Sequence, residues 1–473
     1  MIYYKEDFRE IRSILYSLYP KDNLRRSSKL ALFKISEVGN EDFLNSKSAY
    51  LYEIIKSDPE CENKLALFEE QFCTDKKCIN CPLAKYCNSF IYSCRRNINV
   101  SNPVIIDLFC GAGGLSLGFK QAGYRILLAN DIESSCIDTY MHNHPEIPSD
   151  SIFLGDIKKL VNGINDHFDV AKVDVIVGGP PCQGFSMANR QRLIDDPRNY
   201  LYKEYVRIVN NVKPKFFVME NVKGMLSVAH QVKEDFERTG YDVSFSVVNA
   251  KDFGVPQNRE RLIFIGNCIG VDNNKVFDVI KNISNTSNKY VLNDALIGLR
   301  PLEASGVKND TDNYSYNSGN IIELNLNQEN SEYVSLINEG HRSIFTFNHK
   351  ARYNNERDIE IFRRLNPGDR SDDPKIADIM PYARRNKIFK DKYYKLEGDK
   401  VCKTITAHMK FDCNMYIHPW QARGLTPREA ARVQSYPDDY FFRGAFTKTY
   451  MQIGNSVPPL LSKALASAIK IFI

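Results

Sequence analysis

The chain has 473 residues, enough for roughly two to three domains of average size. Hydrophobic residues make up 43% and charged residues 26%, which excludes a disordered, collagen-like or small disulfide-stapled chain. The net charge is only +5, because 63 basic residues nearly balance 58 acidic ones, so composition alone does not indicate a nucleic-acid partner. No apolar run is long enough for a membrane helix, and the charged N-terminus lacks the apolar core of a signal peptide. We therefore expect a cytoplasmic protein with no membrane partner.

Residues 1–100 are expected to form a mainly helical domain that ends in a cysteine cluster. Apolar residues recur at helical spacing in the first turns, at Phe8, Ile11, Leu15 and Leu18. Six of the twelve cysteines of the chain fall within residues 61–94. Without a secretory signal, these cysteines should be reduced thiols rather than disulfides.

Four of the clustered cysteines follow the pattern C-x4-C-x2-C-x5-C, namely Cys73, Cys78, Cys81 and Cys87. Thiolates so closely spaced suit a tetrahedral zinc ion or a four-iron cluster. The stretch resembles the iron–sulfur loop of helix-hairpin-helix DNA glycosylases, although it is two residues short between its first two cysteines. The pattern predicts a zinc or 4Fe-4S site, with an unliganded, reduced loop as the alternative.

From residue 101 to 270, strand-like runs alternate with helical stretches. The runs are VIIDLF, RILLAND, VDVIVGG, KFFVMEN, SFSVVNA and RLIFIGN. Strands and helices alternating at this spacing predict an α/β fold with a mostly parallel, doubly wound sheet. Residues 421–473 resume this regular pattern, with helices expected in TPREAARVQ and PPLLSKALASAIK.

The intervening residues, 271–420, have a different character. Stretches such as NKVFDVIKNISNTSN are rich in Asn and Ser with little periodicity, so we expect loops around short elements. The stretch PYARRNKIFKDKYYKL interleaves basic and aromatic residues, a pattern that can hold phosphates and stack on bases. A solvated basic surface is the alternative interpretation of that stretch.

Three predicted strands end in groups suited to a nucleoside. DLFCGAGG, residues 107–114, follows the first strand, and its glycines allow a tight turn and the close approach of a ligand. Asp131 ends the second strand, about 20 residues on, where a carboxylate can accept hydrogen bonds from ribose, and Ile132 can pack against adenine. Asp156 ends a third strand. Together these strand ends predict a nucleoside-containing cofactor.

Later strand ends carry candidate catalytic groups. Cys182 lies in the turn GPPCQGFS, where open α/β sheets place their active sites, so its thiol is a candidate nucleophile. Glu220 ends the next strand, and a buried carboxyl there can act as a proton donor. Arg259 and Arg261 in QNRERL are two residues apart, on one side of an extended segment.

These motifs, in this order, resemble those of the bacterial DNA (cytosine-5)-methyltransferases. The resemblance covers about residues 103–270 and 340–473 and rests on DLFCGAGG, the acid of NDIE, GDI, GPPCQGFS, ENVKGML, QNRERL, RGLTPREAARVQSYPD and GNSVPP. It implies a Rossmann-like, S-adenosylmethionine-dependent methyltransferase domain, residues 101–270, that residues 421–473 complete. Residues 271–420 would then be a target-recognition region, in which the basic–aromatic stretch contacts DNA. Residues 1–100 lie outside the resemblance.

The resemblance also implies roles for single residues. Cys182 would attack C6 of a cytosine flipped out of double-stranded DNA, Glu220 would protonate or hydrogen-bond N3, and Arg261 would hold O2. Arg259 would brace its loop or a phosphate, and no side chain is assigned to remove the C5 proton. The residues implied to line the S-adenosylmethionine pocket are Phe109, Gly111, Gly113, Leu115, Asp131, Ile132, Asp156, Ile157, Leu201, Asn455 and Val457.

A restriction–modification role, with a cognate restriction endonuclease as partner, follows from the family, and we expect a monomer associated with the bacterial nucleoid. Two alternatives remain at this stage. One is a tRNA cytosine-5 methyltransferase, although that branch typically has a short recognition segment and a threonine in the catalytic loop. The other is a non-catalytic DNA-binding protein of the same fold, although Cys182, Glu220 and the glycines are all present. The target DNA sequence is not indicated.

Overall fold

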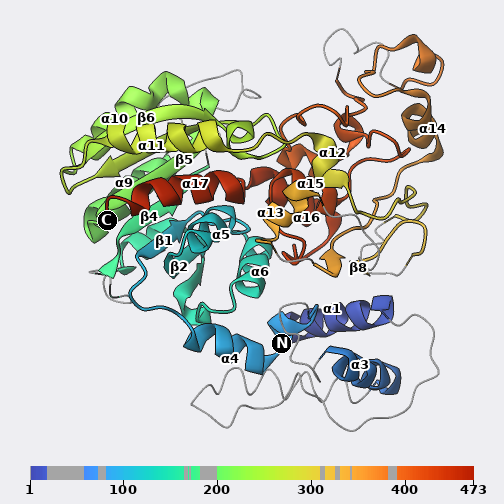
Figure 1. Ribbon diagram of the computed structural model, residues 1–473, viewed down its shortest axis with the longest axis horizontal. Coiled ribbons are helices and arrows are strands. Elements are labelled where there is room, and N and C mark those ends of the chain that lie inside the picture. The colour runs from blue at the N-terminus through green and yellow to red at the C-terminus, as the bar shows by residue number, and fades with distance from the viewer. Residues whose placement is uncertain are drawn as a thin grey trace.

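A seven-stranded sheet organises the molecule, and shorter elements pack at one end of it (Figure 1). The computed structural model describes residues 2–18, 58–72, 81–164, 169, 172–181, 200–308, 315–324, 331–340, 343–381 and 391–473. The strand order is β3-β2-β1-β4-β5-β7-β6. The strands are Val104–Leu108 (β1), Arg125–Asp131 (β2), Ile152–Leu154 (β3), Val175–Gly178 (β4), Phe216–Val222 (β5), Asp242–Asn249 (β6) and Glu260–Asn267 (β7). Strands β1 to β5 pair in parallel, whereas β7 runs antiparallel to both β5 and β6.

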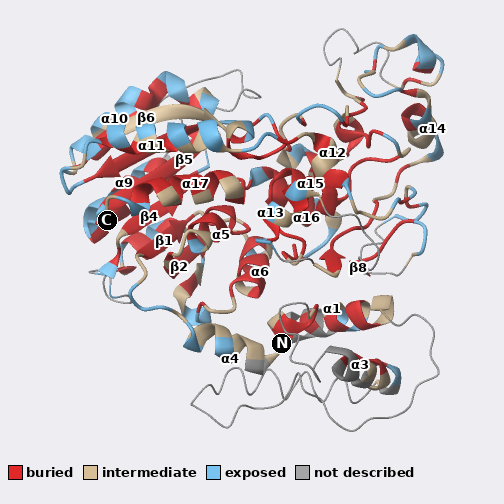
Figure 2. Ribbon diagram, in the orientation of Figure 1, coloured by how far each residue is buried: buried red, intermediate tan, exposed pale blue. Residues whose placement is uncertain are grey.

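Successive strand residues alternate between two apolar cores, one on each face of the sheet. Ile105 belongs to the first core and Ile106 to the second. The first face is covered by α5 (Gly114–Gln121), α6 (Ser134–Asn143), α11 (Asn273–Thr286) and α17 (Pro459–Lys470). The second face is covered by α7 (Ile157–Val161), α9 (Tyr200–Val212) and α10 (Ala229–Glu237). Figure 2 shows the buried strands beneath helices whose outer faces are exposed, which confirms the predicted doubly wound α/β fold.

Helix α11 corrects the expectation of loops after residue 270. Val276 and Ile280, four residues apart, are both buried in the first core. Asp272 caps the helix, because its side chain accepts a hydrogen bond from the backbone N–H of Asn274. The high content of Asn and Ser in this stretch conceals an apolar stripe, so the loop interpretation of this stretch was wrong.

Of the other elements, those from α12 to α16 lie to the right of the sheet in Figure 1, and α1, α3 and α4 lie along the bottom of the view. They are α1 (Ile2–Leu18), α3 (Pro59–Phe72), α4 (Asn88–Arg96), α12 (Leu292–Leu296), β8 (Ile322–Leu324), α13 (Glu332–Ile337), β9 (Phe345–Phe347), α14 (Glu356–Arg364), α15 (Pro427–Val433) and α16 (Phe446–Asn455). Ile11 and Leu15 of α1 are buried in one cluster with Phe347 and Phe441, so the N-terminal helix packs against later parts of the chain. Among the described helices, none is long and apolar enough to cross a membrane.

The first and last helices of the sheet domain pack closely because of a glycine. A Cβ on Gly118 of α5 would lie 2.4 Å from the Cβ of Ser462 in α17. The Ser462 hydroxyl donates a hydrogen bond to the carbonyl of Leu115 at 2.7 Å, and the Tyr124 hydroxyl donates one to the carbonyl of Ala466 at 3.0 Å. The end of the chain therefore completes the core that the DLFCGAGG motif begins.

Replacing Gly118 with alanine should lower the free energy of unfolding by about 1–3 kcal/mol, because the added methyl group overpacks the α5–α17 contact. This loss opposes the gain in helix propensity that the same substitution brings. Chemical denaturation measures the change. Asn282→Ala, on the exposed side of α11, is the control, because it changes helix propensity without changing a packed contact. A Gly118→Ala protein as stable as this control would contradict the close packing.

Candidate active site

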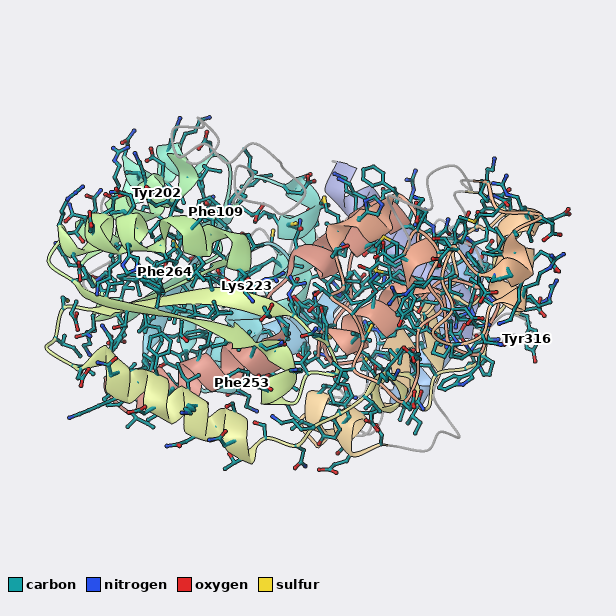
Figure 3. All side chains as sticks on the ribbon, turned by 90° about the horizontal axis from the view of Figure 1, so that it is seen from above. Phe109, Tyr202, Lys223, Phe253, Phe264 and Tyr316 are labelled. Carbon is teal, nitrogen blue, oxygen red and sulfur yellow. The ribbon has the colours of Figure 1, made fainter. Side chains whose placement is uncertain are left out.

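The carboxyl ends of four parallel strands meet at one edge of the sheet. The register pairs Leu108 of β1 with Asn130 of β2 and with Gly178 of β4, and Gly178 with Met219 of β5. Open α/β sheets bind their ligands at this edge. The structure therefore brings several predicted motifs together, because DLFCGAGG, Asp131, GPPC and Glu220 lie at the ends of β1, β2, β4 and β5. In Figure 3, Phe109 and Lys223 lie toward the middle of the molecule, whereas Tyr316 lies at the far end of the recognition segment.

The turn after β1 has an unusual backbone. Phe109, Gly111 and Gly113 have positive φ angles of 56°, 53° and 85°. A Cβ on Gly111 would meet no atom within 4 Å, whereas one on Gly113 would lie 2.7 Å from the hydroxyl of Tyr440. Gly111 thus leaves open space beside the backbone, and Gly113 instead allows close packing. A positive φ at Phe109 is uncommon for a residue with a side chain and is typical of ligand sites.

Asp131 joins the end of β2 to this turn. Its Oδ2 accepts a hydrogen bond from the backbone N–H of Gly111 at 2.8 Å, and its Oδ1 accepts one from Glu133 at 2.8 Å. Burial raises the pKa of Asp131, although these backbone hydrogen bonds oppose the shift. The large apolar side chains nearby are open to solvent, because Ile132 is 72% exposed and Leu154 is 51% exposed. A carboxylate beside exposed apolar groups fits the ribose and adenine of a nucleoside.

The other predicted cofactor residues differ in burial. Asn455 at the end of α16 is exposed, and Leu201 and Asp156 are half-buried. Asp156 also caps α7, because its Oδ1 accepts a hydrogen bond from the backbone N–H of Lys158 at 2.9 Å. Leu115, Ile157 and Val457 are buried in the two cores. Their contact with a cofactor stays a prediction.

A buried carboxyl that the sequence analysis did not assign lies under the same turn. Asp107 Oδ2 accepts a hydrogen bond from the hydroxyl of Ser116 at 2.6 Å, and that hydroxyl lies 2.5 Å from the Tyr140 hydroxyl. In the described part of the chain, no donor reaches the buried Oδ1 of Asp107. Burial raises the pKa of Asp107 to about 7. Its place in DLFCGAGG was visible in the sequence, but its burial was not.

The stability of the protein should depend on the protonation of Asp107. In the unfolded chain an aspartate titrates near pH 4, so the stability that comes from protonating Asp107 is present below about pH 4 and is lost as the pH rises through about 7. Asparagine cannot ionise. From pH 5 to pH 8 the protein should therefore lose about 2 kcal/mol relative to Asp107→Asn, as measured by chemical denaturation. Parallel pH profiles for the two proteins would contradict the raised pKa.

Glu220 and Arg261 form an ion pair between β5 and β7. The antiparallel register pairs Val222 with Arg261 and Glu220 with Ile263, so Glu220 and Arg261 are diagonal neighbours on one face. Arg261 Nε lies 2.7 Å from Glu220 Oε1, and the two side chains are 12% and 11% exposed. A Cβ on Gly179 would lie 3.0 Å from Glu220 Oε2, so the second carboxylate oxygen faces the loop that leads to Cys182.

Asn221 fastens the same loop to β5. Its Nδ2 donates a hydrogen bond to the carbonyl of Pro180 at 2.9 Å, and its Oδ1 accepts one from the backbone N–H of Val222. Pro180 is buried and Pro181 is exposed, so the chain leaves the core just before Cys182. Cys182 itself lies outside the described residues, which stop at 181 and resume at 200.

Arg259 is buried and hydrogen-bonds to backbone carbonyls instead of joining the Glu220–Arg261 ion pair. Its Nη1 donates to the carbonyl of Ile405 at 2.7 Å, and its Nη2 donates to the carbonyls of Ser456 at 2.8 Å and Gly454 at 3.1 Å. These carbonyls belong to the recognition segment and to the GNSVPP motif. The position suits the bracing role expected for Arg259 and leaves no exposed surface for a phosphate.

Two other predicted sites lie partly outside the described residues. Cys73 and Cys78 lie outside them, whereas Cys81 and Cys87 are half-buried. Within the described ranges, no group of three or more His, Cys, Asp or Glu could hold a metal ion, so the zinc or 4Fe-4S site stays a prediction.

Residues 382–390 of the basic–aromatic stretch are also not described. Farther along the stretch, Tyr393 and Lys395 are buried. The Tyr393 hydroxyl donates a hydrogen bond to Asp358, and Lys395 Nζ donates one to the carbonyl of Phe362. The expected DNA contact is therefore wrong for these two residues, because both side chains bond within the protein.

Comparison with known proteins identifies the family. The family model of the C-5 cytosine-specific DNA methylases matches residues 104–471. The type II methyltransferase M1.HphI of Haemophilus parahaemolyticus is 35% identical over 81% of this chain and 91% of that protein. The type II methyltransferase M.DdeI of Desulfomicrobium norvegicum is 36% identical over 77% and 88%. A solved structure described as a DNA modification methyltransferase of an E. coli prophage is 25% identical, with a TM-score of 0.56 over 78% of this chain and 99% of that one.

The chain therefore belongs to the C-5 cytosine-specific DNA methylase family and is a DNA cytosine-5 methyltransferase. Its methyl donor is S-adenosylmethionine and its substrate is DNA, as in the family. The open space at Gly111, the carboxylate of Asp131 and the exposed Ile132 fit the nucleoside part of this donor. The two named relatives are type II methyltransferases, which favours a DNA-methylating enzyme over the tRNA and the non-catalytic alternatives.

Proposed function

We propose that the protein methylates one cytosine within a specific sequence of double-stranded DNA, through a covalent bond between Cys182 and C6 of a flipped base. The observation that carries this proposal is the Glu220–Arg261 pair, which lies beside the loop that leads to Cys182. We also propose that the enzyme is the modification partner of a restriction endonuclease. The names of its relatives, which are type II methyltransferases, support this second part.

The paired side chains prepare the cytosine ring for attack. Glu220 gives a proton or a hydrogen bond to N3, and Arg261 holds O2, so negative charge does not accumulate on the ring. The electron pair of the Cys182 thiolate forms the S–C6 bond, and C5 becomes nucleophilic. Both partners of the pair are largely buried, and hydrogen bonds act more strongly in a site from which water is excluded.

S-adenosylmethionine, when bound, supplies the methyl group that C5 takes. Asp131 and Ile132 would hold its ribose and adenine, with Phe109 and Gly111 in the adjoining turn. After transfer, C5 gives up its proton to a base, the S–C6 bond breaks, and Cys182 leaves as a thiolate, which restores the aromatic ring. Arg259 takes part only indirectly, by holding the recognition segment and the GNSVPP motif against β7.

Bisulfite sequencing of plasmid DNA from an expressing host tests this function. We expect methylation of one cytosine in a recurring short sequence, and none with Cys182→Ala, because that variant lacks the nucleophile. Cys268→Ala removes an exposed cysteine elsewhere and should leave the methylation pattern unchanged. Unmethylated plasmid from a folded protein that binds S-adenosylmethionine would contradict the proposal.

A further inference from the structure

Arg443 lies in the loop that precedes α16, and its side chain is buried against the N-terminal helix α1. Its side chain is only 4% exposed. Its Nη2 lies 2.6 Å from Asp7 Oδ1, and its Nε lies 2.9 Å from Glu10 Oε1, both on α1. Glu10 Oε2 also accepts a hydrogen bond from the hydroxyl of Tyr86 at 2.7 Å. The Arg443 guanidinium and the carboxylates of Asp7 and Glu10 thus join the N-terminal helix to the C-terminal part of the chain.

The backbone of Arg443 extends this connection to two further helices. Its N–H donates a hydrogen bond to the Thr139 hydroxyl in α6 at 2.9 Å, and that hydroxyl donates one to Gln452 Oε1 in α16 at 2.7 Å. Gln452 Nε2 donates to the carbonyls of Arg443 and Ser135, each at 3.1 Å. One buried polar network therefore holds α1, α6 and α16 together.

Two helices of this network, α6 and α16, adjoin residues of the proposed cofactor site. Helix α6 directly follows Asp131 and Ile132, and α16 ends at Asn455. The chain after α16 continues the link, because the Ser456 hydroxyl donates a hydrogen bond to the carbonyl of Gln452 and accepts one from the hydroxyl of Tyr436. A shift of α6 relative to α16 would therefore move Asp131 relative to Asn455.

Apolar packing at this junction is incomplete. A cavity of about 450 Å³ lies between the three helices, lined by residues that include Arg9 of α1, Asp138 of α6 and Phe446 of α16. Because the helices do not close on one another here, the polar network at Arg443 is a direct physical link between α1 and α16. Figure 1 shows α1 below α6 and β8, with α3 below it in turn.

We propose that Arg443 is a positioning residue for the S-adenosylmethionine site and that the N-terminal helix sets the affinity for this cofactor through it. Paired with Asp7 and Glu10, Arg443 fixes α6 and α16 so that Asp131 and Asn455 face the cofactor together. Removing Arg443 leaves two buried carboxylates without their counter-charge, and removing Asp7 or Glu10 breaks one of the two ion pairs to α1. Either change frees the two helices to shift. S-adenosylmethionine then binds only the fraction of molecules in which α6 and α16 keep their original arrangement, so its apparent affinity falls. The inference rests on the cofactor site proposed above.

The test uses the full-length protein and two readouts, the dissociation constant for S-adenosylmethionine by calorimetry and the steady-state KM values. Asp7→Asn and Arg443→Gln should weaken S-adenosylmethionine binding by about three- to thirtyfold and raise its KM, with a smaller effect on kcat and on the KM for DNA. Arg443→Lys should restore part of the affinity. Arg238→Gln, which breaks surface pairs with Glu234 and Asp235 on α10, is the matched control and should bind normally.

The outcomes separate a positioning role from a structural one. A lower melting temperature with an unchanged dissociation constant would overturn the proposal. Glu10→Gln, at the more accessible partner, replaces Asp7→Asn if that variant does not fold. Asp131→Ala distinguishes an error in the proposed cofactor site from an error in the role of Arg443. If it also leaves binding unchanged, the proposed cofactor site is wrong; if it weakens binding while the Arg443 variants do not, only the role of Arg443 is wrong.

Discussion

The pairing of β7 with β5 is the constraint on which the active site depends. Arg261 reaches Glu220 because the antiparallel register makes them diagonal neighbours on one face, and a slip of one residue would turn Arg261 to the other face. Arg259, just before β7, holds the carbonyls of Ile405 and Ser456. The same short segment therefore fixes the catalytic pair, the recognition segment and the GNSVPP motif relative to one another.

The cofactor side depends on contacts between distant parts of the chain. The α5–α17 packing at Gly118 closes the core beneath the first turn, and the Asp131 carboxylate ties the end of β2 to Gly111. Asp107, buried below that turn, has its pKa raised to about 7 by desolvation, which makes the turn sensitive to pH. On the other side, Arg443 connects the N-terminal helix to the helices that flank the pocket. The pocket is thus shaped from both ends of the chain.

The sequence predicted local features well and long-range ones poorly. Short apolar runs predicted β1, β2 and β5, and the motifs predicted which strand ends carry chemistry, because both signals lie within a few residues. Helix α11 was missed, since its buried stripe is sparse among Asn and Ser. Arg259 and Arg261 have different partners because of strand register and of residues far along the chain. The partners of Arg443 lie hundreds of positions away. No local pattern encodes those contacts.

Covalent trapping on DNA tests whether Glu220 and Arg261 activate a cytosine for attack by Cys182. A duplex carries 5-fluorocytosine at the methylated position, so that loss of the C5 proton is blocked and the S–C6 bond persists. With S-adenosylmethionine, we expect a protein–DNA adduct on Cys182 that contains one transferred methyl group. We expect no adduct with Cys182→Ala and adduct formation on the order of a hundredfold slower with Glu220→Gln. An adduct in Cys182→Ala, or an unchanged rate in Glu220→Gln, would contradict this mechanism.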